Sequence, residues 1–197
     1  MAKAGTDVRV WQRMLSGRRL DLADPSPFDI EPEDIALGLS RQHRWNGQTR
    51  GEHGFSVAQH SLLVLEIMRA ADPALERRWQ LAALLHDAPE YVLHDLITPL
   101  KNLVGDVFRS VEDRLLRAVH LRFALPAVLP AEVKKAIKVA DRVAAATEAV
   151  HLAGFREDEL GPVLGLKGIK PLPPPLEVWP SRLACQRYLD AVKALSA

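Results

Sequence analysis

The stretch SVAQHSLLVLEIMRAADPALERRWQLAALLHDAPE, residues 56–90, decides the fold of this 197-residue chain. Its apolar residues recur every three or four positions, which is the period of an amphipathic helix. Ser56 and Gln59 have the spacing of a capping box, so a helix is expected over residues 56–71, before an Asp-Pro pair. A second helix is expected over residues 74–87. The stretch therefore predicts two consecutive helices that are apolar on one side.

The same periodicity predicts helices on both sides of this stretch, and those helices span residues 31–40, 105–123, 131–153 and 181–195. The first 30 residues predict a short helix or ribbon followed by a loop. Residues 41–55 predict a polar, glycine-containing loop, and residues 91–104 predict a turn-rich connection. Because no segment shows the alternation of a strand, the predicted fold class is all-α.

The length of the chain suits one well-buried domain and is short for two. We expect a single domain over residues 1–197, with its core in about residues 30–153 and its polar site at the centre of the helical bundle. Residues 154–180 are rich in proline and glycine, which predicts a long irregular segment before the last helix.

Composition and charge exclude several classes of function. The net charge is +1, so the chain lacks the overall positive field that gathers nucleic acid or an anionic membrane. The only cysteine is Cys185, which excludes an internal disulfide and a thiolate metal cluster. No secretory leader or membrane-spanning run is visible in the sequence. These features predict a cytoplasmic protein that binds a small molecule.

Four polar residues fall on helix faces that are otherwise apolar: His60, His86, Asp87 and Asp141. Taken singly, each is as well explained by a hydrogen-bonded core histidine or a capping carboxylate. Two buried carboxylates nevertheless cost several kcal/mol unless a cation or a hydrogen-bonded partner balances them. One divalent cation would bind all four groups at once. Imidazole and carboxylate ligands without sulfur suit Mn, Fe, Co, Ni, Zn or Mg, and they do not choose among these metals.

The ordered set of these four residues resembles the signature of the HD-domain phosphohydrolase superfamily. The segments VAQHSLLV, LLHDAPEYVLHDLITPLK and IKVADRVAA resemble the branch that contains the bacterial 5′-deoxynucleotidases. The resemblance covers about residues 30–150. It implies an all-helical enzyme that binds one divalent metal, cleaves phosphate esters of nucleotides and commonly forms a homodimer.

The resemblance also implies a role for each matching residue. The four residues named above match the metal ligands, while Glu90 and Asp95 match two catalytic carboxylates beside the metal and the substrate phosphate. Arg44 matches a phosphate-binding arginine, and Trp45 matches an aromatic residue that crowds the 2′ position of the sugar. The chemistry agrees, because a guanidinium fits phosphate bidentately and a carboxylate can carry a proton as the P–O bond breaks.

The sequence departs from that branch in two places. Gln59 stands where those relatives carry a glutamate, and the loop NGQTRGEHGF after Trp45 lacks a proline-bearing stretch. Three functions therefore remain open. The first is hydrolysis of deoxynucleoside 5′-monophosphates, and the second is removal of triphosphate from deoxynucleoside triphosphates. The third is metal and nucleotide binding without turnover.

Overall fold

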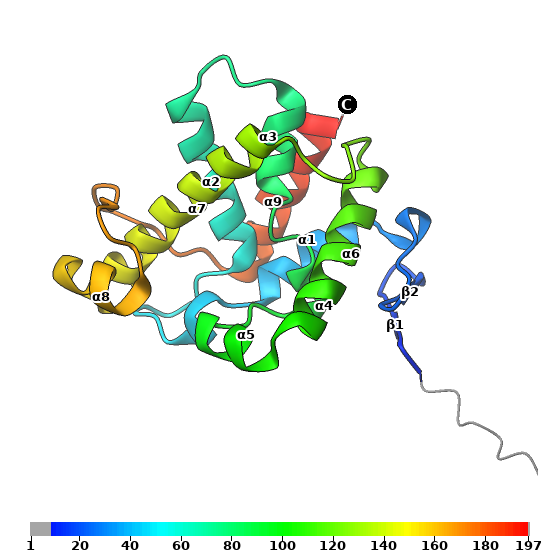
Figure 1. Cartoon of the computed structure of the whole chain (residues 1–197), viewed down its shortest axis with the longest axis horizontal. Coiled ribbons are helices and arrows are strands. Elements are labelled where there is room, and N and C mark those ends of the chain that lie inside the picture. Colours follow the sequence, from blue (N-terminus) through cyan, green and yellow to red (C-terminus); the bar gives the residue numbers. More distant parts are fainter. Residues whose placement is uncertain (1–8, 197) are drawn as a thin grey trace, which may run out of the picture.

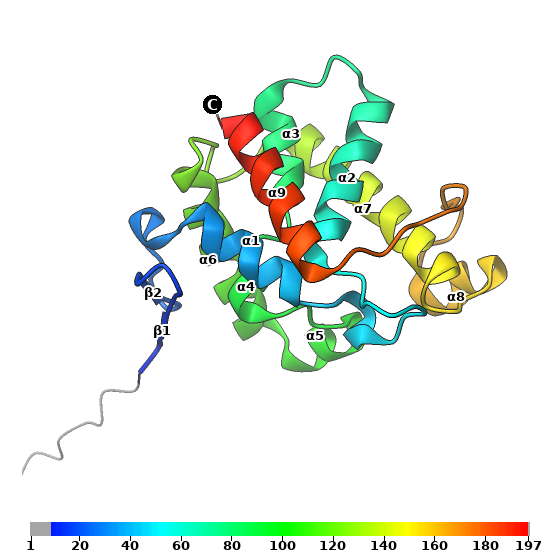
Figure 2. The ribbon, with the colours of Figure 1, turned by 180° about the vertical axis from the view of Figure 1, so that it is seen from behind.

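A computed structural model describes residues 9–196 and shows a helical bundle with a small hairpin at its edge (Figures 1 and 2). The α-helices of this part of the chain are α1 (Pro32–Arg41), α2 (Val57–Ala71), α3 (Arg77–Leu84), α4 (Glu90–Leu93), α5 (Thr98–Val104), α6 (Asp106–Arg122), α7 (Ala131–His151), α8 (Leu160–Leu164) and α9 (Ser181–Ser196). Short 3-10 helices are η1 (Pro27–Asp29), η2 (Arg44–Gly47) and η3 (Glu157–Glu159). The all-α fold class is confirmed.

The hairpin consists of strands β1 (Trp11–Arg13) and β2 (Arg19–Asp21), which pair antiparallel with Gln12 opposite Leu20. The sequence of the first 30 residues predicted either a short helix or a ribbon, and the hairpin is the ribbon. Leu20 is fully buried and joins the main core, and the hydroxyl of Ser16 donates to the buried carboxylate of Asp34 on α1 at 2.5 Å. These contacts hold the hairpin against the bundle.

Helix α2 lies at the centre of the bundle. It packs against α7 and α3 and also touches α1 and α9. Figures 1 and 2 show α7 on one side of the molecule and α1 with α9 on the opposite side. The buried face of α2 carries Val57, His60, Val64 and Met68, as its periodicity predicts. Because His60 is on this face, its imidazole is fully enclosed between the packed helices.

The helix predicted over residues 74–87 is shorter than expected. Helix α3 ends at Leu84, a turn carries residues 85–89, and α4 begins at Glu90. The turn-rich connection expected over residues 91–104 instead holds the end of α4 and all of α5. Pro89 accounts for the break, because a proline cannot donate the hydrogen bond that continues a helix.

The start of α2 confirms half of the predicted capping box. The Ser56 hydroxyl accepts a hydrogen bond from the N–H of Gln59 at 3.2 Å. The Gln59 side chain does not return to the cap. Its amide nitrogen donates to the carbonyl of Glu177, and its oxygen accepts from the N–H of Trp179 at 3.0 Å. Gln59 thus holds the segment before α9 against α2.

Residues 154–180 are more ordered than their composition predicts, because they include η3 and α8. Their apolar side chains join a second, smaller core with α7, whose buried members are Ala146, Ala149, Leu160 and Leu166. Figure 1 shows α8 at the far end of α7, away from the hairpin. None of the helices in residues 9–196 is long and apolar enough to cross a membrane.

Gly38 lets α1 approach α4 closely. A Cβ placed on Gly38 would lie 2.7 Å from both the Cβ and the carbonyl oxygen of Tyr91. Since Tyr91 is next to Glu90, this close approach also fixes the position of Glu90.

We predict that Gly38→Ala lowers the free energy of unfolding by about 1–3 kcal/mol, because a helix must shift to relieve the overlap. Urea unfolding followed by circular dichroism measures the change. Gly161→Ala in α8 is the matched control, since a Cβ there would meet nothing closer than 3.6 Å. Equal stability of the two variants would show that the α1–α4 contact is not tight.

Candidate metal centre

Three predicted ligands from separate parts of the chain converge at the centre of the bundle. His60 lies on α2, His86 in the turn after α3, and Asp141 on α7. One ligand atom from each residue lies within 4.8 Å of the other two. Nε2 of His60 is 3.2 Å from a carboxylate oxygen of Asp141, and the two imidazole centroids are 5.3 Å apart. The group has the composition and spacing of a site that could hold a metal ion.

Hydrogen bonds fix the orientation of both imidazoles. Nδ1 of His60 lies 2.5 Å from a carboxylate oxygen of Glu148, and Nδ1 of His86 lies 2.8 Å from the carbonyl oxygen of Ala83. A carbonyl or carboxylate oxygen accepts a hydrogen bond, so each Nδ1 carries a proton and Nε2 is the nitrogen available to a metal. Both Nε2 atoms are buried without a hydrogen-bond partner. Two such nitrogens aimed at one point are suited to a metal.

Asp87 approaches the same point from the turn. One of its carboxylate oxygens lies 3.2 Å from Nε2 of His86 and 3.4 Å from Nε2 of His60. Neighbouring side chains on a continuous helix diverge by about 100°. The helix break after Leu84 removes that restriction and allows His86 and Asp87 to face one another. All four predicted ligands are therefore brought together.

Glu148 is part of the site although the sequence analysis did not identify it. It is fully buried on α7, two helical turns beyond Asp141, so both carboxylates lie on the same face. One oxygen bonds His60, and the other accepts from Nε of Arg44 at 3.2 Å and from the indole N–H of Trp45 at 3.0 Å. The sequence did contain a signal for Glu148. It is a carboxylate within the mostly apolar run of residues 143–150, and it lies seven residues after the predicted ligand Asp141.

Arg44 and Trp45 come from the loop before α2. The N–H of Arg44 bonds the carbonyl of Phe55 at 2.8 Å, which ties the start of η2 to the residues before α2. The guanidinium also lies 3.4 Å from Asp95 and 3.9 Å from Asp87. Trp45 has a left-handed backbone, with φ of 60°, and its ring lies against Phe155 at a centroid distance of 5.7 Å. Both predicted substrate-binding residues therefore border the cluster.

Glu90 begins α4 and is buried, with one carboxylate oxygen lacking a partner. Its other oxygen accepts from the Lys101 ammonium at 3.3 Å, and Lys101 also bonds Glu112 at 3.1 Å. Burial raises the pKa of Glu90 well above its usual range, and the nearby Asp87 and Asp95 raise it further. Glu90 thus retains its proton at a pH where an ordinary glutamate is ionised.

Negative charge dominates the site and makes it fit for a cation. Five carboxylates surround two cationic side chains; the carboxylates are Asp87, Glu90, Asp95, Asp141 and Glu148, and the cations are Arg44 and Lys101. Burial and Arg44 lower the pKa of His60, yet Glu148, Asp141 and Asp87 outweigh them and hold it well above its ordinary value. A place that attracts a proton in this way also attracts a divalent ion.

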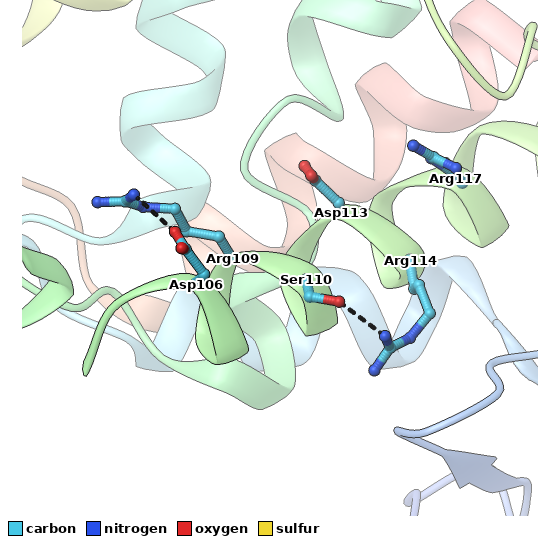
Figure 3. Close-up of a pocket in the computed structure, with 6 residues that line it drawn as sticks. All are labelled: Asp106, Arg109, Ser110, Asp113, Arg114 and Arg117. Carbon is cyan, nitrogen blue, oxygen red and sulfur yellow. Dashed lines mark hydrogen bonds and ion pairs between the residues drawn. The ribbon is translucent and has the colours of Figure 1, made fainter.

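Two hollows on the surface lie apart from this cluster. Figure 3 shows a shallow depression along α6, lined by Asp106, Arg109, Ser110, Asp113, Arg114 and Arg117, in which Arg109 pairs with Asp106 and Arg114 donates to Ser110. The other is a groove of about 330 Å³ between α2 and residues 172–179. Neither is lined by a predicted metal ligand, so neither competes with the central cluster as the candidate metal centre.

Two curated proteins are similar to this chain over most of its length. The uncharacterized protein RCAP_rcc00048 of Rhodobacter capsulatus is 61% identical over 157 residues, which is 80% of each chain. The uncharacterized protein YfdR of Escherichia coli is 32% identical over 152 residues, which is 77% of each chain. The chain belongs to the family of these two proteins. No established protein-family model matches its sequence.

We predict that Asp141→Ala removes the stabilisation that a divalent ion gives to the folded protein. Saturation at 100 times Kd stabilises a binding-competent fold by about 2.7 kcal/mol. Thermal unfolding of chelator-stripped protein, with and without Mn²⁺ or Zn²⁺, measures this effect. Asp113→Ala, at an exposed aspartate of α6, is the matched control and should keep the full metal-dependent rise in Tm. An undiminished rise in Asp141→Ala would show that the ion binds elsewhere.

Proposed function

We propose that this protein is a divalent-metal-dependent phosphohydrolase of the HD-domain superfamily, which hydrolyses deoxynucleoside 5′-monophosphates to deoxynucleoside and phosphate. The observation that carries the proposal is the pair of unpartnered Nε2 atoms of His60 and His86, which meet Asp87 and Asp141 beside Arg44 and the buried carboxyl group of Glu90. Metal ligands alone would fit a structural site. The adjoining Arg44 and Glu90 add the groups that phosphoryl chemistry requires.

A divalent ion bound here would make hydroxide available from water near neutral pH and would polarise a phosphoryl oxygen. The remaining functions belong to side chains of this chain. Arg44 offers a planar set of N–H donors for phosphate oxygens. These donors face Asp87, Asp95 and Glu148, which hold the guanidinium in place.

Glu90 supplies the proton that the leaving group requires. Cleavage of the ester leaves an alkoxide on the 5′ oxygen of the nucleoside, and a carboxylic acid beside it can donate a proton to it. The raised pKa of Glu90 and its unpartnered oxygen suit this role. Lys101 holds the opposite oxygen and thereby orients the group. A protein that only binds metal and nucleotide does not require such a buried acid. Its presence therefore favours an enzyme over a protein that binds without turnover.

Trp45 is the residue we assign to sugar selection. Its indole is fixed on one side by the hydrogen bond to Glu148 and on the other by Phe155. A ring held in this way beside Arg44 would leave little room for a 2′-hydroxyl on a sugar whose phosphate is bound by that arginine. The expected homodimer and the absence of nucleic-acid and membrane partners stay predictions.

The experiment that tests the proposal measures product release from ribo- and deoxynucleoside mono- and triphosphates. Chelator-stripped protein receives Mn²⁺, Co²⁺, Mg²⁺ or Zn²⁺, and chromatography identifies the products. Metal-dependent release of inorganic phosphate from deoxymonophosphates is the expected result. Release of tripolyphosphate from triphosphates would instead establish the second candidate, a deoxynucleoside triphosphohydrolase. No turnover by metal-loaded protein on any of these substrates would contradict both.

Glu90→Gln is predicted to lower kcat by roughly two to four orders of magnitude while the protein still binds the metal, because an amide cannot supply the proton. Steady-state kinetics and calorimetric metal titration measure the two properties. Glu112→Gln is the matched control, since Glu112 bonds the same lysine but lies outside the cluster. Full activity in Glu90→Gln would refute its assignment as the acid.

Trp45→Ala is predicted to raise kcat/KM for ribonucleotides relative to deoxyribonucleotides by about tenfold, the scale of discrimination by a hydroxyl-excluding pocket. Competition between the two sugars at saturating metal measures the ratio. Trp45→Phe keeps an aromatic ring without its N–H and should retain most of the preference for deoxyribose. An unchanged ratio in Trp45→Ala would show that another group selects the sugar.

A further inference from the structure

The Glu148 carboxylate makes contacts on two sides of the site. One oxygen bonds Nδ1 of His60, on the metal side, and the other accepts from Arg44 and from Trp45, on the substrate side. His60 is on α2, the substrate pair is on η2 and Glu148 is on α7, so a single side chain links three elements. Glu148 is fully buried, and water does not compete for these bonds.

We propose that Glu148 is a positioning residue. Its one carboxylate orients both the metal ligand His60 and the substrate residues Arg44 and Trp45. The inference deepens the proposed function, because it assigns to one group the joint assembly of the metal site and the phosphate and sugar site. It goes beyond the four ligands and the substrate pair, which the resemblance to a known superfamily already implied.

The metal side depends on which ring nitrogen of His60 carries the proton. The carboxylate of Glu148 keeps a proton on Nδ1, so Nε2 is the nitrogen that can offer a lone pair to a metal beside Asp87 and Asp141. If the partner of Nδ1 were a donor, the proton would move to Nε2 and the lone pair would face away from the cluster. Glu148 therefore determines whether His60 can act as a ligand.

The substrate side depends on the same carboxylate because two donors converge on its second oxygen. Nε of Arg44 is 3.2 Å away and the indole nitrogen of Trp45 is 3.0 Å away. The first oxygen faces Nδ1–H of His60 at 2.5 Å. The group is consequently an acceptor on both oxygens, as all three partners require.

These requirements make glutamine an unsuitable replacement even though it has the same shape. An amide accepts with its oxygen and donates with its nitrogen. If the oxygen faces His60, the NH₂ group opposes the N–H donors of Arg44 and Trp45. If the oxygen faces those donors, the NH₂ group opposes Nδ1–H of His60 and favours the wrong tautomer. Glu148→Gln must therefore break the bonds of one side, and it also weakens those of the other side, because either orientation removes the charge that both sides use.

The test compares Glu148→Gln with the wild-type chain in two measurements made without nucleotide. Calorimetric titration of chelator-stripped protein with Zn²⁺ gives the metal affinity, which is expected to fall roughly 10- to 100-fold. Nitrogen-15 NMR of metal-free protein reports the Trp45 indole N–H signal, which Trp45→Phe assigns. The indole signal is expected to move toward that of an indole without a carboxylate partner. Asp34→Asn, which alters another buried carboxylate that accepts from Ser16, should leave both measurements unchanged.

A change in the Zn²⁺ affinity alone, or in the Trp45 signal alone, would overturn the proposal, because the carboxylate would then serve one side only. If Glu148→Gln does not fold, Glu148→Asp provides a second test with its own criterion. Its shorter side chain keeps the charge but cannot reach both sides, so at least one of the two signals must move, and no change in either would overturn the proposal. Because neither measurement uses nucleotide, the result stands apart from the hydrolysis assay. If wild-type protein does not bind Zn²⁺, the proposed function fails, while the NMR comparison still tests the hydrogen bonds of Glu148.

Discussion

Excess negative charge in the middle of a helical bundle is the constraint on which the rest of this structure depends. Asp87, Asp141 and Glu148 lie around one buried imidazole, and two cationic side chains do not balance the site. Glu148 is fully buried, and an uncompensated carboxylate at such a position would oppose folding by several kcal/mol. The presence of these carboxylates is physically reasonable where a divalent cation completes the balance. Burial, reinforced by Asp87 and Asp95, raises the pKa of Glu90, and three carboxylates hold the guanidinium of Arg44 in a fixed position.

Much of the fold follows from periodicity in the sequence. The apolar faces of residues 56–71 and 131–153 predicted α2 and α7, and these two helices pack together as the main support of His60 and Asp141. The convergence of the candidate ligands was predictable because polar residues interrupted otherwise apolar faces. The short elements were not predictable from the sequence. Helix α5, η3 and α8 are too short for periodicity to emerge, and tertiary packing stabilises them more than local preference does.

Glu148 and Gln59 show why the remaining site features escaped prediction. Glu148 serves a ligand that is 88 residues away in the sequence, and Gln59 bonds a backbone segment about 120 residues away. Local patterns carry no information about such partners. The structure also accounts for glutamine in place of the glutamate of the resembling branch. Gln59 donates to one backbone group and accepts from another, and a carboxylate could not make both bonds.

The wide separation of the site residues along the chain has a consequence for biosynthesis. Arg44, His60, His86 and Glu148 meet only when α2 and α7 are packed together, after more than two thirds of the chain has left the ribosome. A nascent chain that ends before α7 lacks Asp141 and Glu148, so it presents two histidines without the carboxylates that orient and complete the cluster. Acquisition of a cation would then follow the assembly of tertiary structure and would not guide its early steps. The concentration of free metal at the site of synthesis would accordingly govern how much folded protein becomes loaded, and it would have little effect on how fast the chain collapses.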